Sequence, residues 1–472
     1  MFDQFEVYRM MRQSNPWWNE QGGWEKLPTM YRQAYHETLD ILENRELRRF
    51  VVLSGARRVG KTTVMKQVIA HLLQQGVNPR RVMYLSFDNP MYKLMGFYKV
   101  LEAYEQNVGL DEPCYFFFDE IQYAEEWSLW LKHLYDSRPN VHVVATGSAS
   151  PGIEKGASDS GVGRWRVLRM PTLTFREYCD IVGAHGVSLP GRDKLKTLTE
   201  MSSVDLNGLL LGLADLQPHW TRYLAMGGFP ELLGMSSVER AQVVLREDVV
   251  DKVLKRDVPS LFDVRNTLQL EKIFLYLCLH SGSLINMSEM CRALEGVSMF
   301  TLQRYIDYLR DANLLYVCHN AAYTGKKGLS SQSKFYVADA AIRNASLMID
   351  PYALTETEMG AMAENVVYKH LMYAYGSTHS LGHVRLPGRK KQEVDFSVTH
   401  PAGLRYLCEV KYKRDSSVTR EDAIMTLLHE PKTAGAFLVT RMPTDFGRFE
   451  ETPGGGNALI RIPASAFCYL LG

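Results

Sequence analysis

The stretch GARRVGKT, residues 55–62, has the residue types and spacing of a loop that binds phosphate. Gly55 and Gly60 let the backbone turn its amides toward a phosphate, and the N-terminus of a following helix adds a favourable dipole. Lys61 is expected to reach the β- and γ-phosphates of ATP, and Thr62 to ligate Mg²⁺. The full set predicted to bind the nucleotide in this stretch is Gly55, Ala56, Arg57, Arg58, Val59, Gly60, Lys61, Thr62 and Thr63.

The flanking residues supply the context that this motif requires. RRFVVLSG, before the loop, has the unbroken apolar run of a buried strand, and GKTTVMKQVIAHLLQQG, after it, has a helical pattern that ends at Gly76. A strand, a loop and a helix in this order favour a phosphate-binding site over a surface glycine loop.

A second set of chemically competent residues ends the apolar stretch YFFFDE. The C-terminal residues of parallel strands lie at the edge of the sheet where ligands bind, so we expect Asp119 and Glu120 near the loop. Asp119 is predicted to hold Mg²⁺, and Glu120 to polarise the attacking water. Two successive carboxylates favour hydrolysis of ATP over transfer of its phosphate to a bound acceptor.

Two further features follow the next apolar stretch, VVATGS. Thr146 or Ser148 has a hydroxyl that is placed to bond the γ-phosphate or the water, the alternative being a hydroxyl that caps a loop. Arg164 comes after a Gly- and Ser-rich segment at residues 150–163. It is either a finger supplied to a nucleotide of the same or a neighbouring subunit, or a solvated arginine.

The C-terminal part of the chain contains a second candidate site, in QEVDFSV and LCEVKYK. Strand alternation puts Glu393 and Asp395 on one face of a strand, and Glu409 and Lys411 on one face of the next. Glu364, on the preceding helix, completes a pocket that suits a hard cation such as Mg²⁺ or Mn²⁺. Lys411 would then orient or activate a metal-bound water for attack on a phosphodiester. The alternative is a pair of surface ion pairs.

Local basic residues indicate where nucleic acid would bind. RLPGRKKQ and KYKR form a basic collar near the second candidate site, the alternative being a solvated turn and strand end. A helix–turn–helix–hairpin pattern at residues 265–340 adds further basic side chains. These could contact phosphates, or the module could serve as a spacer or a protein contact. They are Arg304, Arg310, Lys326 and Lys327.

Composition excludes several other classes of protein. The chain has 472 residues, of which 46% are hydrophobic and 23% charged, which predicts a globular protein of two to four domains. Its net charge of +1 provides no overall attraction to nucleic acid. The seven cysteines lack metal-ligand spacing and indicate free thiols in a reducing compartment. No signal peptide and no apolar run of about 18 residues is present, so we expect a cytoplasmic protein with no membrane partner.

The order of these segments resembles that of the bacterial and archaeal AAA+-type P-loop ATPases with a C-terminal domain of unknown function of the restriction-endonuclease-like, PD-(D/E)xK-type fold. The resemblance rests on GARRVGKTTVMKQ, YLSFDNP, YFFFDEIQYAEEWSLWLKHLYD, VVATGSAS, GRWRVLRMPTLTFREY, MGGFPE, KRDVPSL, KFYVADAAIRN, GAMAENVVYKHL and EVDF…CEVK, in the family's order. It implies that Lys61, Thr62, Asp119 and Glu120 form the ATP site. It also implies that Glu364, Asp395, Glu409 and Lys411 form a nuclease-like motif.

The fold class implied is α/β: a P-loop NTPase with an AAA+-like parallel sheet, followed by a helical lid, a winged-helix module and an endonuclease-like α/β domain. The expected divisions are an N-terminal helical extension at 1–45, the ATPase core at 46–175, the lid at 176–262, the winged helix at 263–345 and the endonuclease-like domain at 355–472. Trp17 and Trp18 lie outside the resemblance and are expected to pack or to dock a partner.

Three hypotheses about function follow. In the first, an ATPase gates a nucleic-acid-binding, metal-dependent nuclease in which Asp395 and Glu409 cut, with DNA a better candidate than RNA. In the second, an ATP-driven switch or scaffold uses the endonuclease-like domain only to grip nucleic acid or protein. A nucleotide-regulated transcription factor ranks last because its helix–turn–helix has few basic residues. A homo-oligomer is expected if a neighbouring subunit supplies the arginine finger.

Overall fold

The computed structural model describes residues 3–19, 26–44, 46–147, 163–191, 193–262, 264–321, 332–386, 392–451 and 457–472. The chain divides into two compact units. The N-terminal unit comprises residues 1–170 with 311–313, and the C-terminal unit comprises residues 171–310 and 314–472. Each unit is described by itself.

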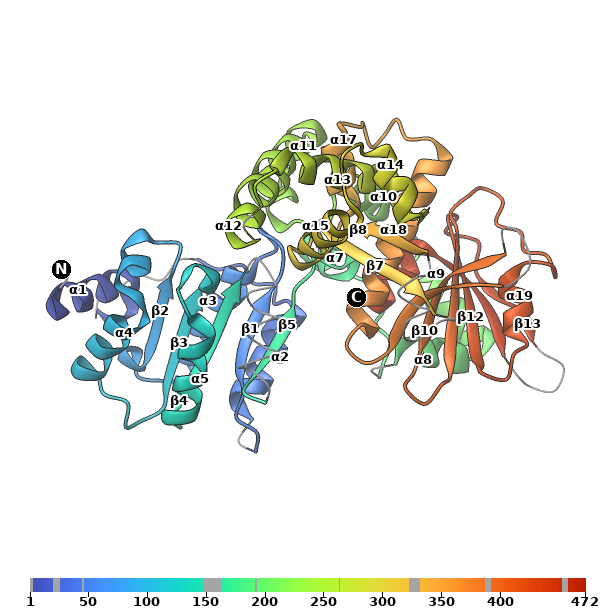
Figure 1. The fold of residues 1–472 in the computed structure, drawn as a ribbon. Coiled ribbons are helices and arrows are strands. Elements are labelled where there is room, and N and C mark those ends of the chain that lie inside the picture. Colours follow the sequence, from blue (N-terminus) through green and yellow to red (C-terminus); the bar gives the residue numbers. More distant parts are fainter. Residues whose placement is uncertain are drawn as a thin grey trace. The chain divides into compact units, whose positions relative to one another are not determined.

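A parallel sheet forms the centre of the N-terminal unit, with the strand order β2-β3-β4-β1-β5 (Figure 1). The central strands β1, β3 and β4 are buried along most of their length, as expected when helices cover both faces. The predicted parallel sheet is therefore confirmed. The strands are β1 (Phe50–Ser54), β2 (Val82–Ser86), β3 (Cys114–Asp119), β4 (Val141–Gly147) and β5 (Trp165–Arg169).

Strand β5 was not predicted, because WRVLR mixes two arginines with apolar residues and lacks the unbroken apolar run of the other four strands. Helices α1, α4 and α5 share one core with alternate residues of the strands, and α2 packs on α3 and β1. The helices of this unit are α1 (Gln4–Ser14), α2 (Gln33–Glu43), α3 (Lys61–Gln74), α4 (Pro90–Asn107) and α5 (Trp127–Ser137).

The N-terminal arm, residues 4–18, lies along the outer strand β2. The side-chain amide of Asn15 bonds both backbone groups of Tyr84, accepting from its N–H (2.6 Å) and donating to its carbonyl (3.0 Å). The indole N–H groups of Trp17 and Trp18 both donate to the carbonyl of Val82, at 2.9 and 2.8 Å. The two tryptophans therefore pack within this unit.

A nine-stranded sheet forms the C-terminal unit, in the order β13-β14-β12-β11-β10-β9-β7-β8-β6. The predicted hairpin of β7 and β8 joins the remaining strands because β7 pairs in parallel with β9, His319 opposite Gly382. The strands are β6 (Leu284–Ile285), β7 (Leu315–Asn320), β8 (Ser333–Val337), β9 (Ser380–Arg385), β10 (Glu393–Thr399), β11 (Arg405–Lys411), β12 (Thr433–Thr440), β13 (Gly447–Glu451) and β14 (Ala458–Pro463).

One hydrophobic core joins segments that the sequence divides into lid, winged helix and endonuclease-like domain. Trp220 of the predicted lid and Tyr336 of the predicted winged helix pack in it with Tyr368, Phe437 and Phe467. The division of this unit into a lid, a winged helix and an endonuclease-like domain remains a prediction. The helices are α7 (Phe175–Val182), α8 (Lys194–Glu200), α9 (Ser203–Leu211), α10 (Gln217–Met226), α11 (Val238–Leu245), α12 (Val258–Phe262), α13 (Thr267–Leu279), α14 (Met287–Ala293), α15 (Met299–Asp311), α17 (Ala340–Leu347), α18 (Glu356–Tyr375), α19 (Ala423–Leu428) and α20 (Ala464–Leu471).

Among the described residues of both units, no helix combines the length and apolar character needed to cross a lipid bilayer.

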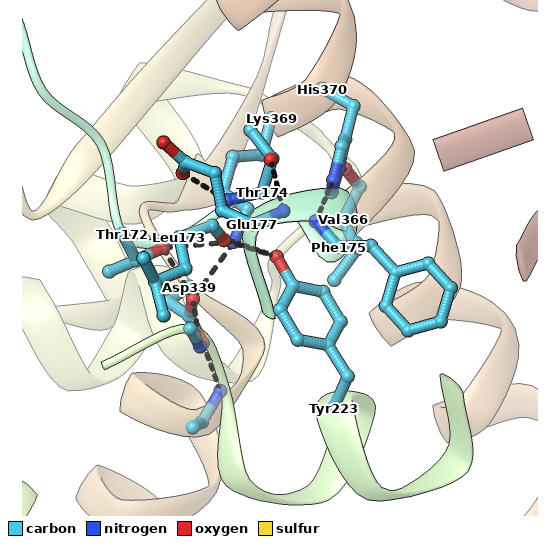
Figure 2. A network of polar contacts seen from close by, with 12 residues as sticks. Thr172, Leu173, Thr174, Phe175, Glu177, Tyr223, Asp339, Val366, Lys369 and His370 are labelled. Atoms are coloured by element: carbon cyan, nitrogen blue, oxygen red, sulfur yellow. Dashed lines mark hydrogen bonds and ion pairs between the residues drawn. The ribbon is translucent and has the colours of Figure 1, made fainter. Parts of the chain in front are cut away.

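A buried ion pair anchors the beginning of the C-terminal unit (Figure 2). The Lys369 ammonium on α18 lies 3.0 Å from Asp339 Oδ2, and both side chains are 1% exposed. The same ammonium donates to Thr172 Oγ1 (2.9 Å), the Leu173 carbonyl (3.2 Å) and the Tyr223 hydroxyl (2.7 Å). Such a pair is tolerated in the interior only when its hydrogen bonds are satisfied. We call the segment 171–175, which is held by these contacts, the connecting segment.

His370 adds a second anchor for the same segment (Figure 2). Its Nε2 accepts a hydrogen bond from the Phe175 N–H (2.8 Å), so the proton is on Nδ1, which donates to the Val366 carbonyl (2.7 Å). Burial, reinforced by the nearby Lys369 charge, lowers the pKa of His370 to about 3. The imidazole is therefore neutral in the folded unit.

We expect this histidine to make the C-terminal unit sensitive to acid. Below the ordinary pKa of about 6.5 the unfolded chain binds a proton that folded His370 does not, so stability falls as the pH falls toward 3. Between pH 7 and pH 5 the loss from this group is roughly 2 kcal/mol. Hydrogen exchange of the α18 amides measures it.

His370→Gln is expected to flatten this pH dependence. The matched control is His185→Gln in the same unit, because the His185 side chain is 73% exposed. An unchanged pH slope in the His370 variant would contradict the assignment.

Candidate functional site

The loop between β1 and α3 has the backbone conformation that its glycines allow. Gly60 has φ of 93° and leads directly into α3, whose N-terminal amides therefore face the loop. At Gly55 an added Cβ would lie 2.2 Å from the Met170 carbonyl oxygen, so no larger residue fits there. Arg58 also adopts a left-handed conformation, with φ of 63°. The strand–loop–helix context predicted for residues 55–62 is confirmed.

Lys61, at the end of the loop, reaches back to the residues at its beginning. Its buried ammonium donates to the carbonyls of Gly55 (2.9 Å) and Ala56 (2.8 Å). Phosphate oxygens are acceptors of the same kind and carry charge, so a phosphate bound in the loop would compete for this ammonium. The carbonyl of Val59, the residue before Gly60, accepts a hydrogen bond from the buried guanidinium of Arg32 (2.7 Å).

Three hydroxyl groups from three different elements donate to the Asp119 carboxylate at the end of β3. Thr62, on α3, and Tyr84, on β2, both donate to Oδ2 at 2.9 Å. Thr146, on β4, donates to Oδ1. Thr62, one of these three donors, is the predicted Mg²⁺ ligand. A carboxylate and a hydroxyl in contact, beside a phosphate loop, fit a hard cation.

Glu120 follows Asp119 in a strained conformation, with φ of 51°. Its N–H donates to Thr146 Oγ1 (2.9 Å), and its carboxylate accepts from the side-chain amide of Gln122. Thr146 therefore links the two predicted residues at the carboxyl end of the sheet, through the side chain of Asp119 and the backbone of Glu120.

The other residues predicted to bind the nucleotide do not all lie at the loop. Arg57 donates to the Tyr123 hydroxyl (2.9 Å), and Thr63 lies half-buried on α3. Ser148 lies outside the described residues. The Arg164 carbonyl accepts from the Phe50 N–H (3.0 Å) at the beginning of β1.

Arg164 therefore lies at the opposite end of the sheet from the loop of its own chain. Its guanidinium is bound to Asp136 through two hydrogen bonds of 2.8 and 3.1 Å. The structure does not bring it to the candidate nucleotide site.

Tyr84 is a site residue that sequence reasoning missed. Its only signal is a hydroxyl in the middle of the mainly apolar strand VMYLS, which also ends in a serine. Strand pairing explains its position, because Tyr84 stands opposite Phe117, two residues before Asp119.

The C-terminal carboxylates do come together, but around a lysine. The Lys334 ammonium, from β8, lies 3.1 Å from Glu364, 3.1 Å from Glu393 and 2.9 Å from Asp395. Its side chain is 3% exposed. Burial opposes its charge, but the carboxylates, Asp395 foremost, outweigh burial and raise the pKa of Lys334. We call Lys334, Glu364, Glu393 and Asp395 the lysine pocket.

Glu409 lies beside this pocket rather than in contact with Lys334. Its Oε2 accepts from the Asp395 N–H (3.3 Å), and Asp395 Oδ2 accepts from the Val410 N–H (2.9 Å). Burial, with the Asp395 charge second, raises the pKa of Glu364 to about 7 and raises that of Glu409 well above its usual value.

Lys411 bonds elsewhere. Its ammonium donates to the Ser417 carbonyl (3.0 Å) and lies 3.4 Å from Asp422. The shared face of Glu393 and Asp395 is confirmed, because both contact Lys334. The predicted metal site is not supported, since an ammonium stands among the carboxylates. Over the described ranges, no cluster of three or more His, Cys, Asp or Glu residues is arranged to hold a metal ion.

Comparison with known families agrees with the N-terminal geometry. Residues 47–179 match the model of a family described as an AAA domain. Residues 217–353 match a family described as a domain of unknown function, and the predicted endonuclease-like domain at 355–472 lies outside both matches. The AAA match and the geometry of the loop support an AAA+-type, nucleotide-binding fold for the N-terminal unit.

Relatives and solved structures are distant. An uncharacterized protein of Haemophilus influenzae is 24% identical over 63% of this chain and 68% of its own length. An uncharacterized protein of Methanocaldococcus jannaschii is 25% identical over 81% of this chain and 79% of its own.

Among solved structures, the Aeropyrum pernix ORC2 protein in ADPNP–ADP complexes is 13% identical over 75% of this chain and 98% of its own, with a TM-score of 0.35. The ORC1 protein of the same organism, in complex with DNA, is 14% identical over 70% and 95%, with a TM-score of 0.29. Neither likeness carries an argument about function.

Tyr84→Phe is expected to weaken MgATP binding about tenfold, because it removes one hydrogen bond to a charged carboxylate, worth about 1.5 kcal/mol. Titration of a fluorescent ATP analogue with Mg²⁺ present measures the affinity. Tyr98→Phe is the matched control, since the Tyr98 hydroxyl bonds Glu102 on the surface of α4. Equal affinities for wild type and Tyr84→Phe would rule out this role.

Proposed function

We propose that the chain binds MgATP in the loop at residues 55–62, hydrolyses it, and uses the cycle to switch a C-terminal unit that binds a partner without cutting it. The observation that carries the first part is the Asp119 carboxylate, which accepts hydroxyl hydrogen bonds from α3, β2 and β4. A carboxylate fixed from three elements is held in position before any ligand arrives.

In the proposed reaction each residue has a separate task. Lys61 would bind oxygens of the β- and γ-phosphates, and Asp119 and Thr62 would hold Mg²⁺, which would supply positive charge beside the phosphates. Glu120 orients a water and accepts its proton as the oxygen attacks the γ-phosphorus and the bond to the ADP oxygen breaks. Thr146 keeps the Asp119 side chain and the Glu120 backbone in a fixed relation.

We expect Glu120→Gln to lower kcat by about 10²-fold or more while MgATP still binds, because the amide cannot accept the proton. Phosphate release and nucleotide titration separate the two effects. Glu105→Gln, an exposed change on α4, is the control. Lys61→Ala should abolish binding. Full ATPase activity in both Glu120→Gln and Lys61→Ala would refute the assignment.

The connecting segment supports the proposed switching. The Met170 N–H donates to the Ser54 carbonyl (2.6 Å), next to Gly55 at the start of the loop. Two residues later, Thr172 Oγ1 donates to Asp339 Oδ2 (2.6 Å) and accepts from Lys369. Along the chain, only Pro171 separates Met170, which bonds the strand before the loop, from Thr172, which belongs to a buried anchor of the C-terminal unit.

Thr172→Val is expected to uncouple the units, because it removes both hydrogen bonds of the Thr172 hydroxyl. In wild type, ATP should alter hydrogen exchange of the α18 amides, whereas the variant should bind ATP without that change. Thr221→Val, on the exposed side of α10, is the control. Coupling is excluded if ATP leaves α18 exchange unaltered in wild type.

Nucleic acid, with DNA the first candidate, remains our proposed partner. Arg304 and Arg310 are exposed on α15, while Lys326 and Lys327 lie outside the described residues. Fluorescence anisotropy with duplex and single-stranded DNA tests the partner, and no binding in any nucleotide state would remove it. A homo-oligomer is a further proposal, tested by light scattering with and without ATP.

A metal-dependent nuclease is the alternative, and the lysine pocket argues against it. An assay for cleavage of DNA and RNA with Mg²⁺ or Mn²⁺ distinguishes the two, and cleavage that Asp395→Asn abolishes would favour the nuclease.

A further inference from the structure

The lysine pocket contains a cation that belongs to the protein. Three carboxylates from two elements surround one ammonium: Glu364 on α18, and Glu393 and Asp395 on β10. The lysine comes from β8, which lies three positions from β10 in the sheet order.

Other protein donors bond three carboxylate oxygens in and around this pocket. The Tyr336 hydroxyl, on the same face of β8 as Lys334, donates to Glu364 Oε1 (2.6 Å). The Val410 N–H donates to Asp395 Oδ2, and the Asp395 N–H to Glu409 Oε2. Mg²⁺ requires about six oxygen ligands at about 2.0–2.1 Å. In this pocket at least one oxygen of each carboxylate is already bonded to a protein donor.

We propose that Lys334 replaces the divalent cation of an endonuclease-like carboxylate site, and that its ammonium closes that site to metal. The hairpin of β7 and β8 is thereby fastened to the helix and strand that carry the carboxylates. Without the ammonium, the buried carboxylate of Asp395 and the half-buried carboxylates of Glu364 and Glu393 face one another with no counter-charge, which a divalent cation would supply. The pocket would therefore bind a metal ion only after the Lys334 ammonium is removed.

The inference concerns the C-terminal unit alone and does not depend on ATP hydrolysis. It is tested without nucleotide, by Mn²⁺ titration followed by electron paramagnetic resonance and by thermal unfolding with and without Mn²⁺. Wild type is expected to bind no Mn²⁺ in this pocket and to keep the same melting temperature.

Lys334→Met, which keeps the length of the side chain and removes its charge, is expected to melt at a lower temperature. Mn²⁺ should bind this variant in a ratio of one per chain and restore most of the lost melting temperature. Adding Asp395→Asn to Lys334→Met should abolish that binding. Lys413→Met, an exposed change after β11, is the control and should behave as wild type.

Two outcomes overturn the proposal. One is Mn²⁺ binding to wild type that Asp395→Asn removes, because the ammonium would then not exclude metal. The other is a Lys334→Met chain that Mn²⁺ neither binds nor stabilises, including a chain that fails to fold both with and without Mn²⁺. Loss of ATPase activity in separate loop variants bears on the proposed function and leaves this result unaffected.

Discussion

A buried ammonium must be surrounded by acceptors, and the C-terminal unit is organised around two such groups. Lys369 joins the connecting segment to Asp339 and α10, and Lys334 joins a hairpin to α18 and β10. Removing one partner of a buried pair costs about 3–5 kcal/mol, so each cluster fixes segments that are far apart in the sequence. Such clusters need not add net stability, but they permit few alternative arrangements of the chain.

In the N-terminal unit, neutral hydrogen-bond donors stabilise a buried carboxylate. Asp119 is nearly inaccessible to solvent, and within the described part of the chain its carboxylate is held by hydroxyl groups rather than by an ammonium. Hydroxyls leave the carboxylate negative and able to bind a cation, whereas an ammonium neutralises it. The contrast between Asp119 and Asp395 therefore separates a carboxylate prepared for metal from one that is already paired.

The parts of the fold that follow from local pattern were predictable. The apolar runs predicted β1, β3 and β4, and the strand expected to carry Glu393 and Asp395 is β10. The loop, Asp119 and Glu120 could be placed together because parallel strands end at one edge.

Lys334 and Tyr84 could not be found in this way. A lysine at the start of KFYV and a tyrosine in VMYLS have no local sign of burial or of their partners, since those partners come from strands and helices elsewhere in the chain. The orientation of Lys411 depends on the loop around Ser417 and Asp422, which strand alternation does not describe.

The N-terminal arm has a consequence for how the protein behaves among copies of itself. An outer strand such as β2 presents backbone groups that can pair with another chain, and proteins generally protect such edges. Here Asn15 takes both backbone groups of Tyr84, and two indoles take the carbonyl of Val82. The arm therefore acts as a substitute neighbour made of side chains, and it guards the nucleotide-binding sheet against strand addition and aggregation.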